Sequence, residues 1–211
     1  MKLIKPSFEI LEIMRTAEAL QLIEQAGRTC YKSEDKITNT SCISFVQRLL
    51  KLGHESVLEH SAITVKFIVD RGVTHELVRH RLVAYSQEST RYCNYKGGVA
   101  FILPCWMKDY KDYGEHNFPF EYHVWFQAME RAESNYINLI NIGWTPQQAR
   151  SVLPNSLKTE IVATANFREW RHILKLRTSK AAHPQMREIM IPLLKELKGQ
   201  LPIIFDDIEV E

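Results

Sequence analysis

Residues 61–91 read SAITVKFIVDRGVTHELVRHRLVAYSQESTR, and the pattern at the start of this stretch sets the expected fold class. Within 61–69 the large apolar side chains fall on alternate positions, and Lys66 lies on the opposite face. A period of two residues is typical of a strand with one buried face. The face expected to be buried consists of Ile63, Val65, Phe67 and Val69.

A short helix is expected directly after this strand. Thr74 is suited to cap it, because a threonine hydroxyl can accept a hydrogen bond from an amide of the first helical turn. Leu77 and Val78 would then be carried by the helix, residues 79–81 would lie near its end, and residues 86–91 would form the loop beyond.

The segment 79–91 is rich in groups that bind anions. It contains three arginines, one histidine, two serines, one glutamine and one glutamate in RHRLVAYSQESTR. Guanidinium groups hold phosphate through paired hydrogen bonds and keep their charge, while hydroxyl and backbone N–H groups can bind the remaining oxygen atoms. The alternative is a solvated helix face, but such a face usually mixes both signs and favours Lys and Glu over repeated Arg.

Further elements follow from periodicity and capping residues on either side. Strands are expected at residues 99–103 and 157–165. Helices are expected at residues 41–52, 120–142 and 145–154, and from residues 166 and 184 onwards. Because the strands are scattered among helices without regular βαβ spacing, the predicted class is α+β, with a small, mostly antiparallel sheet in a single domain over residues 1–211.

Two helix starts carry capping boxes. Thr145 with Gln148 forms one, and Asn166 with Glu169 forms the other. The helix from Asn166 is expected to bury Trp170, Ile173 and Leu174, and its polar side carries Arg168, Arg171 and Arg177.

The C-terminal part is expected to end in a helix and a peripheral tail. Pro192 should kink or divide the helix that begins at Pro184, because a proline inside a helix removes a hydrogen bond. The tail after Gly199, including the pair Asp206 and Asp207, is expected to be a solvated end.

Composition excludes several classes of protein. The chain has 211 residues, 45% hydrophobic residues and a net charge of +2, which fits a globular protein and not a disordered one. The small net charge argues against a partner such as a nucleic acid polymer. No apolar run approaches the roughly 18 residues that a membrane span needs, and MKLIKPSFEI lacks a signal-peptide core, so a cytoplasmic location is expected.

Other candidate centres are weaker. The four cysteines include no CxxC pair, so reduced and mostly structural thiols are expected. His54 and His60 are six residues apart, which misses the spacing of a helical zinc site, so no metal is predicted. Ser89 lacks a recognisable base that would activate it, which favours a binding role over a nucleophilic one.

Four ordered blocks of this sequence resemble the flavin-dependent thymidylate synthase family. They are GHESVLEH at 53–60; RHR followed by seven residues and STRY, ending at 92; ARSVLP at 149–154; and NFRE with LKLR between 166 and 177. The resemblance covers the chain from about Gly53 to Arg187. In contrast, LPCW around Cys105 only weakly resembles the nucleophile loop of the flavin-free thymidylate synthases, and the polar stretch after it reads as an irregular loop without a base or cation to activate a thiol.

The resemblance implies a homotetramer with FAD between subunits, which uses dUMP, methylenetetrahydrofolate and NADPH. The residues that it implies for FAD are Ser56, Arg79, His80, Arg81, Gln87, Asn166, Phe167, Arg168 and His172. Those that it implies for dUMP are Glu76, Leu77, Val78, Arg79, Gln87, Glu88, Ser89, Thr90, Arg91, Arg150 and Arg177. Glu76 stands where some relatives have Gln, and Thr90 where some have Gly.

Arg177 is the expected catalytic residue. Adding hydride to carbon 6 of a uracil ring builds negative charge on the ring, and a fixed cation in a dry pocket stabilises that charge. Two other classes remain as alternatives. An RNA-binding or regulatory module would bind with a steep salt dependence, and a nucleotide hydrolase would need clustered carboxylates for magnesium, whereas the acidic residues here are dispersed.

Overall fold

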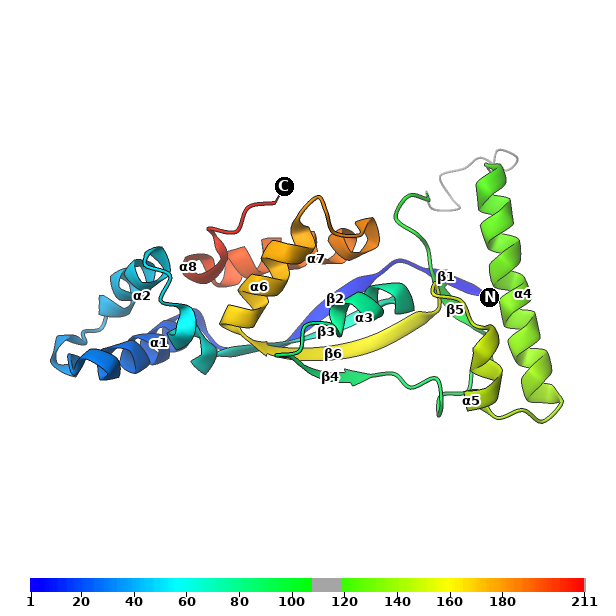
Figure 1. The fold of residues 1–211 in the computed structure, drawn as a ribbon, viewed down its shortest axis with the longest axis horizontal. Helices are drawn as coiled ribbons and strands as arrows, with labels where there is room; N and C mark the ends of the chain where they lie inside the picture. Colours follow the sequence, from blue (N-terminus) through cyan, green and yellow to red (C-terminus); the bar gives the residue numbers. More distant parts are fainter. Residues whose placement is uncertain (108–118, 211) are drawn as a thin grey trace. The chain divides into compact units, whose positions relative to one another are not determined.

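The computed structural model describes residues 1–107 and 119–210. Helices and strands alternate along the chain (Figure 1). The strands are β1 Lys2–Ile4, β2 Ser7–Ile13, β3 Ala62–Asp70, β4 Ala84–Gln87, β5 Ala100–Ile102 and β6 Lys158–Asn166. The α-helices are α1 Thr16–Tyr31, α2 Ser41–Lys51, α3 Arg71–Leu77, α4 Phe120–Asn141, α5 Pro146–Ala149, α6 Phe167–Thr178, α7 Pro184–Gln200 and α8 Pro202–Phe205. Short 3-10 helices are η1 Glu34–Lys36, η2 Glu55–His60 and η4 Arg150–Val152.

The strands form two small sheets. One has four strands in the order β2-β3-β6-β4, and the other is the parallel pair β1-β5. Strands β3 and β6 run antiparallel, because Phe167 N–H donates to Ser61 O at one end of the pair while Arg71 N–H donates to Leu157 O at the other. The predicted combination of helices with a small antiparallel sheet is therefore confirmed.

The described residues divide into two compact units. The first unit contains Met1–Ser7, Phe67–Arg79 and Ser86–Ile161, and the second contains Phe8–Lys66, His80–Tyr85 and Val162–Glu211. Strands β2, β3, β4 and β6 each have residues in both units. The expectation of a single domain stays a prediction.

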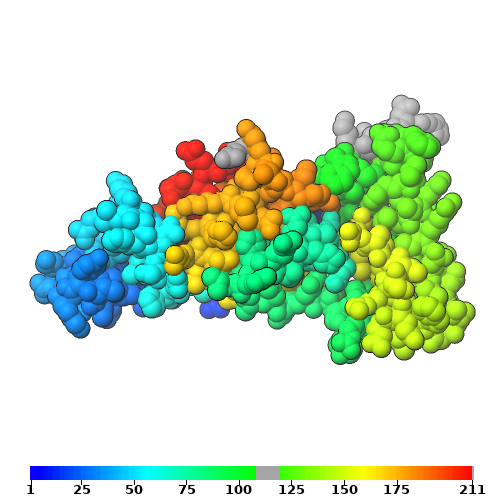
Figure 2. Space-filling view, in the orientation of Figure 1, coloured from blue at the N-terminus to red at the C-terminus, as the bar shows by residue number. Residues whose placement is uncertain are grey.

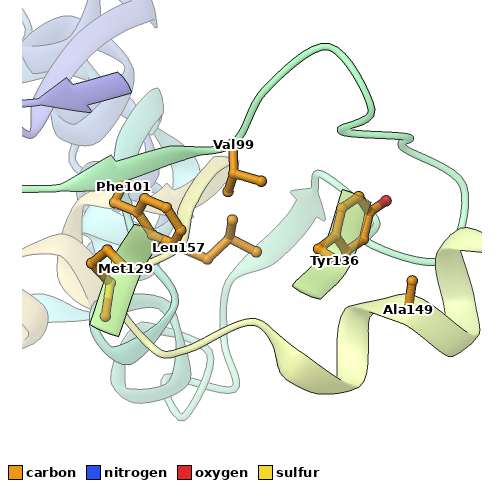
Figure 3. Packing of buried hydrophobic residues seen from close by; sticks show 6 residues of the cluster. All are labelled: Val99, Phe101, Met129, Tyr136, Ala149 and Leu157. Atoms are coloured by element: carbon orange, nitrogen blue, oxygen red, sulfur yellow. The ribbon is translucent and has the colours of Figure 1, made fainter. Parts of the chain in front are cut away.

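The core of the first unit is built on α4 and the strands beside it (Figure 3). Tyr136 of α4 is fully buried, and its hydroxyl accepts a hydrogen bond from Tyr95 N at 3.2 Å. The buried residues of this cluster are Val99, Phe101, Met129, Tyr136, Ala149 and Leu157. Burying such side chains supplies most of the free energy that orders a unit of this size.

The core of the second unit is helical. Helices α1 and α2 pack against each other, and α6 packs on α7, as Figure 1 shows; Figure 2 shows α1 in blue against α2 in lighter blue without a gap. Trp170 of α6 is fully buried, and its indole N–H donates to Ile63 O of β3 at 3.0 Å. This bond fixes α6, which carries several of the predicted site residues, on the sheet.

Periodicity predicted most elements close to their observed bounds. The predicted strands at 61–69, 99–103 and 157–165 correspond to β3, β5 and β6, and the predicted helices at 41–52 and 120–142 correspond to α2 and α4. At residue 145 the Gln148 side chain accepts from Thr145 N–H at 2.9 Å, and at α6 the Asn166 side chain accepts from Glu169 N–H at 2.9 Å. Strands β1 and β2 and helix α1 lie in a part of the chain for which no element was predicted.

The start of α3 differs from the prediction. Asp70 is the capping residue, and its carboxylate accepts a hydrogen bond from Val73 N at 2.7 Å. Thr74 lies inside the helix, where its hydroxyl donates to Arg71 O. A carboxylate at the helix start interacts favourably with the helix dipole as well as with free amides, which explains why Asp70 takes this place. The predicted loop at 86–91 is also partly wrong, because Ser86 and Gln87 end strand β4.

The C-terminal tail is not peripheral. Helix α7 continues through Pro192 without being divided, and the residues after it are packed into the second unit. Leu201, Ile204, Phe205 and Ile208 are all buried. The tail is held by its apolar side chains and by one ion pair that the sequence did not reveal.

That ion pair joins Arg171 of α6 to Asp207. The Arg171 Nη1 and Nη2 atoms donate to the two Asp207 oxygens at 2.6 and 2.7 Å, and Nη1 also donates to Ile204 O. The sequence assigned Arg171 to the polar side of α6, but the residue is 2% exposed and therefore buried. The hydrogen bonds from Arg171 lower the pKa of Asp207, as expected for a carboxylate with a fixed cationic partner.

No helix of the described residues has both the length and the apolar composition that crossing a bilayer requires. All four cysteines are free, and Cys30 and Cys105 are exposed. Most of the polar loop predicted after Cys105 lies at 108–118, outside the described residues.

Candidate active site

The segment 88–91 that follows β4 is held by contacts within the first unit. Gln87, directly before this segment, makes the first of these contacts. Its side-chain amide nitrogen donates to Thr74 Oγ1 at 3.0 Å and to Thr159 Oγ1 at 3.3 Å. One amide thus ties the end of β4 to α3 and to β6. Gln87 therefore has a structural role, whatever its contact with a ligand.

Glu88 fixes the next position of the segment. Its carboxylate accepts from Tyr95 Oη at 2.8 Å, from Lys158 Nζ at 3.0 Å and from Glu160 N at 3.2 Å, while Glu88 N donates to Glu160 O. Burial and the hydrogen bond to Glu88 raise the pKa of Tyr95, so the phenol remains a donor. The side chain of Glu88 is thus used to position the 88–91 segment.

A small pocket, called here the basic pocket, lies in the first unit beside this segment and has a volume of about 270 Å³. Arg150 of η4 lines this pocket, and the Nη1 atom of Arg150 donates to Thr90 Oγ1 at 3.1 Å. The lining residues are Arg71, His75, Thr90, Arg150, Ser151, Leu153, Pro154, Asn155 and Leu157. The structure therefore brings together two predicted nucleotide-binding positions, Thr90 and Arg150, that are 60 residues apart in sequence.

Arg71 is a basic-pocket residue that the sequence did not indicate. Its Nη1 atom is buried and has no hydrogen-bond partner among the described residues. A buried guanidinium nitrogen without a partner is costly, and an anion in the pocket would satisfy it. The position could have been suspected from its place directly after β3, because a residue at a strand end lies where ligands commonly bind.

The other predicted nucleotide positions differ in exposure. Leu77 is 1% exposed, so a ligand could meet it only through the backbone, whereas Val78, Arg79 and Arg91 are exposed. The backbone N–H of Arg91 donates to Ser89 Oγ at 3.3 Å. Glu76 at the end of α3 is partly buried.

A second cavity, called here the α6 cavity, lies in the second unit and has a volume of about 540 Å³. It brings together three predicted flavin-binding residues, Asn166, Arg168 and His172, with Lys175. Its remaining lining residues are Glu55, Glu59, Leu82, Glu169 and Arg171. A smaller pocket of about 340 Å³ places Ser56 and His54 beside the same Arg168, so this arginine lines both spaces.

Arg168 is held at the surface by Glu59. Its Nη1 atom lies 2.6 Å from Glu59 Oε1, and the two side chains are 52% and 45% exposed. Exposed ion pairs of this kind contribute little to stability, so Glu59 could be replaced by another anion at small cost. Of the remaining predicted flavin positions, Arg81 is exposed and Phe167 is fully buried against Phe205.

His80 and Arg177 form a close pair in the second unit. Arg177 Nε lies 3.0 Å from His80 Nε2, and His80 Nδ1 lies 3.6 Å from Glu169 Oε1. The imidazole of His172 approaches His80 edge-on, with ring centroids 5.7 Å apart. Burial, the charge of Arg177 and the neighbouring His172 lower the pKa of His80 from 6.5 to about 4, so His80 is neutral near pH 7.

Sequence comparison identifies the relatives of this chain. The sequence pattern of the family described as "Thymidylate synthase complementing protein" matches residues 12–203. A flavin-dependent thymidylate synthase from Corynebacterium efficiens is 34% identical over 205 residues, which cover 92% of this chain and 81% of the relative. The corresponding protein from Mycobacterium tuberculosis is 33% identical over 207 residues, covering 90% and 79%.

Solved structures show the same fold. A UMP/dUMP methylase from Streptomyces cacaoi, bound with 5-Br dUMP, superposes with a TM-score of 0.80 at 23% identity and covers 98% of this chain and 96% of that chain. The match in fold and the family pattern over most of the sequence agree. The chain belongs to the family of flavin-dependent thymidylate synthases.

Proposed function

We propose that this enzyme converts dUMP to dTMP by reductive methylation. Methylenetetrahydrofolate is the carbon donor, and FAD reduced by NADPH is the source of hydride. Family membership supports the reaction. The basic pocket is the structural observation that favours a nucleotide monophosphate as the substrate.

The basic pocket suits the phosphate of dUMP. Arg150 is already oriented by Thr90, and Arg71 offers a buried donor that has no partner among the described residues. Two guanidinium groups and His75 on one small pocket match a dianion, because hydrogen bonds between charged groups are roughly twice as strong as neutral ones. Arg91 and Ser89 lie on the adjoining segment and extend this set of donors.

The α6 cavity suits part of a flavin dinucleotide. Arg168, Lys175 and His172 provide positive charge or hydrogen-bond donors for a diphosphate, and Ser56 lies in the neighbouring pocket that shares Arg168. Because the ion pair between Arg168 and Glu59 is exposed and contributes little to stability, Arg168 can exchange it for a contact with a phosphate. When bound, the reduced flavin supplies the hydride for the reaction.

Arg177 is proposed to stabilise charge on the pyrimidine ring. A guanidinium stays protonated at any pH at which the protein is folded, and Arg177 is held by His80 through its Nε atom. Placed against the imide edge of the uracil ring, it would favour ionisation there and polarise the ring, so that no thiol has to add to it.

A homotetramer is proposed as the working assembly. Large apolar side chains remain exposed along α4, where Phe120 is 80% exposed and Val124 is 52% exposed. Apolar side chains on successive turns of one helix are suited to contact with a second copy of the chain.

An absorption spectrum followed by product analysis tests the proposal. The purified protein is expected to be yellow, to bleach with NADPH under anaerobic conditions and to regain colour when dUMP and methylenetetrahydrofolate are added, with dTMP found by mass spectrometry. A colourless protein that, supplied with FAD, forms no dTMP would contradict it. Steep salt-dependent binding to RNA in that protein would favour the alternative of a nucleic acid-binding module.

A further inference from the structure

The contact between Arg177 and His80 determines the protonation state of the imidazole. An arginine Nε atom carries a hydrogen and can only donate, so His80 Nε2, at 3.0 Å, must accept. A neutral imidazole with an unprotonated Nε2 carries its proton on Nδ1. That proton faces Glu169 Oε1, which lies 3.6 Å from Nδ1.

Other groups around His80 favour the same state. Arg177 and His172 disfavour a positive charge on the imidazole, and Tyr85 Oη donates to the His80 backbone oxygen at 3.3 Å. Glu169 is held near the start of α6, where its backbone N–H donates to Asn166. Each of these residues comes from the second unit, so the arrangement is internal to one compact part of the chain.

We propose that His80 is a positioning residue for Arg177, with Glu169 behind it selecting the tautomer. The side chain of His80 is only 5% exposed and is directed at Arg177, which assigns it a task different from the flavin contact implied by the RHR motif. The expected effect of His80 on turnover rests on the proposed function of Arg177. The effect of His80 on the orientation of Arg177 is independent of that function.

The consequence for catalysis follows from the geometry of the guanidinium. Because Nε is held, the plane that carries the two terminal nitrogens is fixed, and the cation does not have to be oriented during the reaction. Removing the acceptor would leave Arg177 in place but take away the hydrogen bond that orients its Nε atom. Turnover would then fall more than the affinity for dUMP.

Two substitutions at His80 separate this role from flavin binding. Gln places an oxygen acceptor near the position of Nε2, whereas Asn is too short to do so. We expect His80→Asn to lower kcat about 10- to 100-fold per bound flavin, with KM for dUMP changed less than 3-fold, by analogy with the cost of misplacing a catalytic group by about 1 Å. His80→Gln should recover most of the lost rate, and both variants should retain wild-type flavin content. His60→Asn, an exposed histidine in the same unit, is the matched control.

Several results would overturn the proposal. Loss of flavin from both variants, with normal turnover of the flavin that remains, would show that His80 contacts the cofactor. Equal defects in the Asn and Gln variants would show that an acceptor at Nε2 is not what matters.

A second measurement does not depend on activity. In protein labelled with ¹⁵N-histidine, the nitrogen shifts of His80 should report an unprotonated Nε2 and a protonated Nδ1 near pH 7, and Arg177→Ala should change the Nε2 shift. A protonated Nε2 would refute the placement. If wild-type protein forms no dTMP, the proposed function is wrong, and this measurement still decides whether His80 holds Arg177.

Discussion

At the scale of single residues, three arginines show that side-chain type does not determine role. Arg171 is buried and paired with Asp207, so it holds the fold together. Arg71 has a buried nitrogen with no partner among the described residues, which indicates a ligand. Arg177 donates a hydrogen bond to the neutral imidazole of His80, which brings no negative charge to the pair. Burial and partners, which only a structure provides, separate these roles.

Arg177→Ala should retain the fold and the flavin but lose most turnover. Removing one fixed donor to developing charge commonly costs about 2.7–4 kcal/mol of transition-state stabilisation, or roughly two to three decades in rate. The measurement is kcat per bound flavin, with circular dichroism as the check on folding. Near-normal turnover in this variant would refute the catalytic role.

Arg71→Leu should weaken binding of dUMP through its phosphate. The loss of one hydrogen bond between charged groups corresponds to about 1.5–3 kcal/mol, or roughly 10- to 150-fold in Kd. Isothermal titration with dUMP and with deoxyuridine tests the assignment, because the nucleoside has no phosphate and its weaker binding should be unchanged. Arg15→Leu, in which an 88% exposed side chain is removed, is the control. Equal affinity of wild type and Arg71→Leu for dUMP would exclude Arg71 from the phosphate site.

The lowered pKa of His80 makes part of the stability dependent on pH. The pKa of His80 is about 4 in the folded protein, compared with 6.5 for an ordinary histidine in an unfolded chain. The unfolded chain therefore binds the proton more readily. The contribution of neutral His80 is complete above pH 6.5 and decreases as the pH falls towards 4, at a rate of at most about 1.4 kcal/mol per pH unit. Urea unfolding at pH 7.5, 5.5 and 4.5 should show the stability difference between wild type and His80→Asn shrinking as the pH falls. A difference that is constant with pH would contradict the shift.

At the scale of secondary structure, the sequence predicts elements better than their attachments. Alternation and helical spacing located β3, β6 and α4, because each buries one regular face. The capping of α3 by Asp70 was missed because Thr74 is an equally suitable residue in sequence, and only the observed hydrogen bond to Val73 decides between them.

The same limit applies to the candidate site. Motif blocks indicated Arg150 and Thr90 but could not show that they touch, and Arg71 carried no motif at all. The tail was expected to be solvated because a pair of adjacent acidic residues usually is. In the structure Asp207 pairs with Arg171, which lies 36 residues earlier in the sequence. Contacts across such separations depend on the packing of whole elements, which local pattern does not encode.

Asp207→Ala should therefore destabilise the second unit, whereas Asp206→Ala should not. The first substitution removes one of the two carboxylates that pair with the buried guanidinium of Arg171, the other being Glu55. We expect a loss of about 1–3 kcal/mol, reduced by the 53% exposure of Asp207. Asp206 is the matched neighbour, and its removal should change stability by less than about 0.5 kcal/mol. Urea denaturation at pH 7 measures both. If the two variants are equally stable, the ion pair does not anchor the tail.

At the scale of the whole molecule, charge is local. The net charge is only +2, yet each compact unit has its own space with cationic side chains in its lining. These spaces are the basic pocket in one unit and, in the other, the α6 cavity, whose lining also includes Glu55, Glu59 and Glu169. An almost neutral protein can bind anionic nucleotides in this way without attracting polyanions in general.

Sedimentation equilibrium should give four times the mass of the 24.6 kDa chain. Charge introduced on the exposed apolar side chains of α4, as in the double variant Phe120→Asp with Val124→Asp, should lower that mass if α4 contributes to the assembly. Lys2→Asp, at another exposed position of the first unit, controls for the added charge. A monomeric wild-type protein would contradict the proposed tetramer.

The anchored 88–91 segment has a consequence for affinity. Gln87, Glu88 and Thr90 each make hydrogen bonds to other residues of the folded chain. The conformational entropy of this part of the chain is therefore lost during folding and not on encounter with an anion. A nucleotide that arrives finds a preorganised receptor, so more of the attraction between its phosphate and the guanidinium groups remains as net binding free energy.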